Sequence, residues 1–129
     1  NIVTLLVLVL YGPKEALFVL IVRVLLGSMF GGLMISFFYS LSGGILCWLV
    51  MSLISALLKK KFLVLISMCG AAAHNIGQIL AAIVITHSIS VVAYLPVLML
   101  SAMITGFFTG LAALVCSKRL QKILRVRFF

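Results

Sequence analysis

Acidic residues are almost missing from this chain. Its 129 residues include no Asp and one Glu, Glu15, against ten Lys and Arg. Magnesium-dependent enzymes hold the metal with carboxylates, and one Glu cannot build such a site. His74 without a carboxylate partner is a weak basis for acid–base chemistry. We therefore expect no catalytic activity, no metal and no other cofactor.

Cysteine is also sparse. Cys47, Cys69 and Cys116 lie far apart in apolar runs, and no two of them have a CxxC spacing. This pattern indicates neither a disulfide framework nor a zinc site. Small, soft packing residues are the expected role of all three.

A charged surface is the third absence, because 66% of the residues are hydrophobic and only 9% are charged. Apolar runs of about twenty residues predict an integral membrane protein. Helices are the expected state, since open strands or loops in lipid leave backbone groups unpaired. The predicted fold is an all-α polytopic bundle that forms one transmembrane domain over residues 1–129.

Five apolar segments can be marked. They are 1–11, 14–38, 43–58, 62–86 and 91–117. Gly12-Pro13 separates the first two, and the stretch YSLSGG (39–44) is predicted to turn the chain between the next two. The first segment is too short to cross about 30 Å of hydrocarbon. We expect a further helix before Asn1, which would make six.

The basic residues are distributed as in the cytoplasmic loops of membrane proteins. Lys59, Lys60 and Lys61 lie between two apolar segments, and a basic tail, 118–129, follows the last one. The positive-inside rule places both in the cytoplasm, and the links 39–42 and 87–90 outside. This distribution, rather than a basic face, argues against nucleic-acid binding. A multi-pass membrane protein with a cytoplasmic C-terminus is expected.

Three polar residues fall at one depth in the predicted bundle. Arg23, His74 and Thr105 each lie about ten to twelve residues from a cytoplasmic helix end, which is roughly 15–18 Å deep. Arg at the bilayer centre costs at least about 2.5 kcal/mol, so Arg23 should face the bundle interior. Glu15 lies near the inner surface, so no acid is available to pair with it. We expect an anionic or strongly polar ligand in a cavity that His74 and Gln78 share.

Structural roles compete with this interpretation. His, Gln, Ser and Thr in membrane helices commonly hydrogen-bond neighbouring helices, and for His74 and Gln78 this alternative stays open. The small-residue ridges Gly27-x-x-x-Gly31 and Ala102-x-x-x-Gly106 are explained by close helix packing. Arg23 is the residue for which a functional role is favoured over a structural one.

The order of motifs resembles the Gx transporter family, also called heptaprenyl diphosphate synthase component I. The motifs are NIVTLL, LYGPKEAL, RVLLGSMFGG, SFFYSLSGG, AAAHNIGQIL, AYLPVL and TGFFTGL. This family looks related to the substrate-binding S components of energy-coupling factor transporters. The resemblance implies six helices around a ligand cavity that opens outward, in a protein of the bacterial cytoplasmic membrane.

The resemblance also implies candidate ligand-binding residues. The motif positions are Asn1, Arg23, Ser36, Ser42, His74, Asn75 and Gln78, and the depth argument adds Thr105. The expected function is binding and transport of a small organic solute, with membrane lipid around the protein and a transmembrane and ATPase coupling module as partner. The alternative is a non-catalytic membrane accessory that handles a prenyl or quinone lipid. A third interpretation, a purely structural membrane subunit, also stays open.

Overall fold

The computed structural model describes residues 1–31, 34–58 and 62–124, and its regular structure there is entirely helical. The elements are α1 (Ile2–Leu10), α2 (Pro13–Gly31), α3 (Met34–Leu57), α4 (Leu63–Thr86), the 3₁₀ helix η1 (Ile89–Tyr94) and α5 (Leu95–Leu124). The predicted all-α bundle is confirmed. The triple Lys at 59–61 and the end of the basic tail, 125–129, lie outside the described residues.

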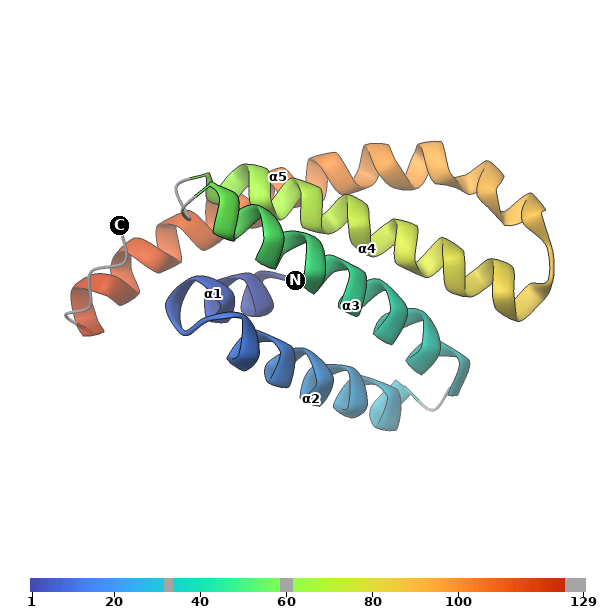
Figure 1. Cartoon of the computed structure of the whole chain (residues 1–129), viewed down its shortest axis with the longest axis horizontal. Helices are drawn as coiled ribbons and strands as arrows, with labels where there is room; N and C mark the ends of the chain where they lie inside the picture. Colours follow the sequence, from blue (N-terminus) through green and yellow to red (C-terminus); the bar gives the residue numbers. More distant parts are fainter. Residues whose placement is uncertain (32–33, 59–61, 125–129) are drawn as a thin grey trace.

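The helices form an up-and-down bundle around α3 and α4 (Figure 1). These two helices run side by side, α5 packs along α4, and α2 packs on α3. The short α1 contacts α2, α3 and α5, and it supplies a large part of the core. The buried core residues are Leu5, Leu8, Val9, Ala16, Cys47, Met51, Leu63, Ile66 and Ala113.

A tight turn connects α1 to α2. Gly12 has φ +123°, a backbone conformation that glycine adopts readily because it lacks a Cβ. Pro13 then begins α2, where its missing N–H costs no helical hydrogen bond. The indole Nε1 of Trp48 in α3 donates to the Pro13 carbonyl at 2.8 Å. This hydrogen bond ties the start of α2 to α3.

Three stretches are long and apolar enough to cross a membrane: Met34–Leu57, Leu63–Thr86 and Ile89–Ile123. Large apolar side chains also cover the outside of the bundle, where Phe30 is 89% and Met34 83% exposed. Such surfaces suit lipid rather than water, since a soluble monomer rarely exposes a large contiguous apolar patch. The chain is a membrane protein.

Glycine lets the central helices approach closely. A Cβ on Gly106 would lie 2.7 Å from the Met68 Cα, and one on Gly110 would lie 2.6 Å from the Val64 Cα. The predicted ridge on the last helix therefore packs against α4. Among residues 1–31, 34–58 and 62–124, the ridge predicted at Gly27 and Gly31 packs against nothing, because a Cβ at either position meets no atom within 4 Å.

The turn predicted at 39–44 is wrong. These residues lie inside α3, so the expected segments 14–38 and 43–58 become Pro13–Gly31 and Met34–Leu57. Ser and Gly suggest a turn in water, but in a membrane bundle they allow close helix contact. Gly43 and Gly44 are both buried, against His74 and Leu20 respectively. The proposed outside link at 39–42 is therefore part of a helix.

Candidate functional site

A polar cavity of about 340 Å³ lies between α2, α3 and α4. Its lining residues are Arg23, Val24, Gly27, Ser36, Ser40 and His74. Four of these six residues carry a charged or hydrogen-bonding side chain. In a bundle whose exterior is apolar, this concentration of polar groups distinguishes the cavity from the clefts around it.

Arg23 provides the positive charge of the cavity. It lies in the middle of α2, is partly buried, and donates from a terminal guanidinium nitrogen to the Asn1 Oδ1 at 3.3 Å. The one acidic side chain of the sequence, Glu15, is eight residues earlier in α2, about 12 Å along the helix. A neutral amide therefore accompanies the guanidinium, and no carboxylate compensates its charge.

His74 faces Arg23 from α4. Its Nδ1 is buried and makes no well-formed hydrogen bond with the described residues. The ring also lies close to α3, where a Cβ on Gly43 would be 3.0 Å from the imidazole Cε1. The ring is therefore held against the backbone of α3, and its buried Nδ1 is not open to the cavity.

Ser36 and Ser40 complete the polar lining from α3. They are four residues apart, so their side chains lie on one face of the helix. Ser40 was not among the predicted site residues, because 39–44 was interpreted as a turn. The signal that could have identified it is its i, i+4 spacing from Ser36.

Two of the predicted residues are used in helix packing. The Ser42 hydroxyl donates to the Gly77 carbonyl at 2.7 Å, across the contact of α3 and α4. The Asn75 side-chain amide donates to the Leu98 carbonyl at 2.6 Å and so links α4 to α5. Neither residue lines the polar cavity.

Gln78 and Thr105 also lie away from the cavity. The Gln78 side chain packs beside Gly43, where a Cβ would meet its Cγ at 2.9 Å. The Thr105 hydroxyl donates to the Ser101 carbonyl of its own helix at 2.8 Å, and the residue is exposed. Of the predicted set, the structure brings together Arg23, Ser36 and His74 at the cavity, with Asn1 hydrogen-bonded to Arg23.

The cavity offers charge and hydrogen bonds rather than metal ligation. Within residues 1–31, 34–58 and 62–124, no three His, Cys, Asp or Glu side chains are grouped so that they could hold a metal ion. A guanidinium, an imidazole and two hydroxyls form a donor-rich set that suits an anionic group with several oxygens.

Comparison with protein families adds an assignment. A family model described as heptaprenyl diphosphate synthase component I matches residues 1–115. The chain belongs to this family. No curated protein and no solved structure matches it. In this member of the heptaprenyl diphosphate synthase component I family, the matched region includes every residue that lines the polar cavity.

Proposed function

We propose that the protein binds a small organic anion in the cavity between α2, α3 and α4, as the substrate-binding subunit of a membrane transport system. The observation that supports this most directly is Arg23, which lies in an open polar cavity with no carboxylate near it. An unpaired arginine inside a membrane bundle is expensive, and such residues mark substrate pathways. An anion would satisfy the guanidinium, and the His74 ring lines the same cavity.

Transport as an S-component-like subunit requires a partner. The name of the family refers to one component of a synthase, which favours assembly with other proteins. A transmembrane and ATPase coupling module is the partner we propose. The alternative, a membrane accessory of a prenyl synthase, would use the same cavity for a lipid phosphate. Either role leaves catalysis to another chain, because Glu15 alone cannot hold Mg²⁺ at a diphosphate.

Native mass spectrometry of the full-length protein, purified in mild detergent, would test the proposal. We expect a co-purified organic anion. Replacing the two cavity hydroxyls together, Ser36→Ala with Ser40→Ala, should weaken its affinity about 5- to 30-fold, the scale of one or two hydrogen bonds. Thr105→Val is the matched control, because its hydroxyl bonds its own helix. A protein without an adduct, and with no affinity for organic anions added to it, would contradict the proposal.

The orientation that we propose places the basic end of α5 in the cytoplasm. Lys118, Arg119 and Lys122 lie in its last turns, and Lys14 lies in the first turn of α2, which starts at the same end of the bundle (Figure 1). Ser88, between α4 and η1, is then outside. A cysteine at position 88, in a background without the three native Cys, should react with an impermeant maleimide added to intact cells. Reaction only after the inner face is opened would reverse the orientation.

A further inference from the structure

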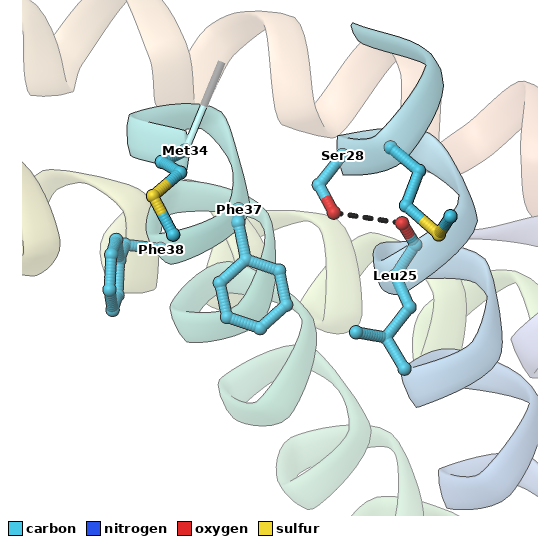
Figure 2. A pocket seen from close by; sticks show the side chains of 6 residues that line it. Leu25, Ser28, Met34, Phe37 and Phe38 are labelled. Atoms are coloured by element: carbon cyan, nitrogen blue, oxygen red, sulfur yellow. Dashed lines mark hydrogen bonds between the residues drawn. The ribbon is translucent and has the colours of Figure 1, made fainter. Parts of the chain in front are cut away.

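The polar cavity has an apolar neighbour in the cleft between α2 and α3. This second cavity has a volume of about 450 Å³ and is lined by Leu25, Ser28, Met29, Met34, Phe37 and Phe38. Figure 2 shows Phe37 of α3 and Leu25 of α2 on facing sides of the cleft. The Ser28 hydroxyl donates to the Leu25 carbonyl at 2.8 Å, so the lining offers few polar groups that are free to bind a ligand. This cavity suits a hydrocarbon.

The two cavities are lined by consecutive residues of the same two helices. On α2, Gly27 lines the polar cavity and Ser28 lines the apolar one. On α3, Ser36 lines the polar cavity and Phe37 lines the apolar one. Three of these four residues are small. A Cβ on Gly27 would meet nothing within 4 Å, so no side chain fills the space beside it.

From this arrangement we propose that the ligand is an amphipathic anion with one chain, which lies in the α2–α3 cleft with its acidic head at Arg23 and His74 and its tail against Leu25 and Phe37. The inference rests on the proposed function and adds to it a binding site for the apolar tail of the ligand. The polar cavity favours an anionic head group, because the Arg23 guanidinium lies there with two serine hydroxyls and no acidic side chain lines the cavity. A volume of about 450 Å³ lies within the range of small-molecule pockets, and it suits one short chain better than the two acyl chains of a phospholipid.

Gly27 provides the sharpest test. A Cβ at this position meets nothing within 4 Å among the described residues, so a leucine here would extend into the space of the polar cavity that Gly27 lines. Gly31→Leu is the matched control, because it is one turn further along α2, is equally open, and lines neither cavity. Both variants should fold as the wild type does. Gly27→Leu should lower the affinity for an amphipathic anion at least tenfold, and Gly31→Leu should leave it within about twofold, less than the weakest single hydrogen bond.

The probes are octyl phosphate and inorganic phosphate, added to the full-length protein in phosphatidylcholine nanodiscs, with empty nanodiscs as the partition blank. We expect octyl phosphate to bind at least tenfold more tightly than inorganic phosphate, since its chain buries apolar surface against Leu25 and Phe37. Leu25→Ala with Phe37→Ala should remove this advantage and leave phosphate binding unchanged. If the two probes bind equally and Arg23→Gln abolishes the binding of both, the proposed tail site is wrong and the proposed function stands.

Two further outcomes would overturn the inference in different ways. If neither probe binds, the proposed function fails with it. If phosphatidic acid in the nanodisc displaces octyl phosphate, the occupant is a two-chain lipid rather than a single-chain anion. Unchanged octyl phosphate binding in the presence of phosphatidic acid supports the single chain.

Discussion

Replacing Arg23 by glutamine is expected to abolish ligand binding and to leave a folded protein in the membrane. The guanidinium is the cation of the polar cavity, and hydrogen bonds to a charged group contribute about 1.5–3 kcal/mol each. Loss of two such bonds should reduce affinity at least about 100-fold. Arg23→Lys keeps the charge but loses the planar fork of donors, so an intermediate loss of affinity is expected.

Arg23→Gln should lower ligand affinity without lowering the stability of the ligand-free protein. At the depth predicted for Arg23, an arginine costs about 2.5 kcal/mol or more, and in the structure its hydrogen-bond partner is the neutral Asn1 at 3.3 Å. Arg23→Gln should therefore unfold no more easily than the wild type in detergent without ligand. Its gain in thermal stability on adding ligand should disappear.

Lys118→Gln is the control for this experiment, because it removes one positive charge at the exposed end of α5. Its ligand affinity should equal that of the wild type. Ligand affinity within about twofold of wild type in Arg23→Gln would show that the guanidinium does not hold the ligand. A lower stability in the absence of ligand would instead assign Arg23 a structural role.

The helical class and most of the last two long helices could be predicted from the sequence. Hydrophobic runs mark helices in lipid because every backbone group must be satisfied within the helix. The predicted segment 62–86 differs from α4 (Leu63–Thr86) by one residue at its start. The boundary between α2 and α3 could not be predicted in this way. Ser and Gly favour turns in water and close packing in a bilayer, and composition does not distinguish these two uses.

The candidate site could also be predicted only in part. Depth along the helices, counted from the charged ends, placed Arg23 and His74 at one level, and both line the same cavity. Depth does not specify the rotation of a helix about its axis, however. Thr105 has the same expected depth, but it lies on an exposed face of α5. The hydrogen bond of Asn75 to Leu98 depends on how α5 packs on α4, which a single-helix pattern does not contain.

The contact of Gly77 with α3 should be highly sensitive to added volume. A Cβ there would lie 2.7 Å from the Ser42 carbonyl oxygen and 2.8 Å from the Gly43 Cα, and both of these atoms belong to the backbone. Backbone atoms cannot rotate away, so a larger residue must push α3 from α4. Because Ser42 donates to the Gly77 carbonyl at 2.7 Å, this separation also breaks an interhelical hydrogen bond.

We expect Gly77→Leu to lower the free energy of unfolding by about 3 kcal/mol or more, the upper range of overpacking in a filled core. The same displacement would move His74, one turn earlier in α4, away from the Ser36 and Ser40 face of α3, so ligand binding should fall as well. Equilibrium unfolding in mixed micelles of mild detergent and SDS measures the first effect. Gly31→Leu adds the same side chain where a Cβ meets nothing within 4 Å among the described residues, and it should unfold as the wild type does. Equal stability of the two variants would mean that α3 and α4 do not meet at Gly77 in the membrane.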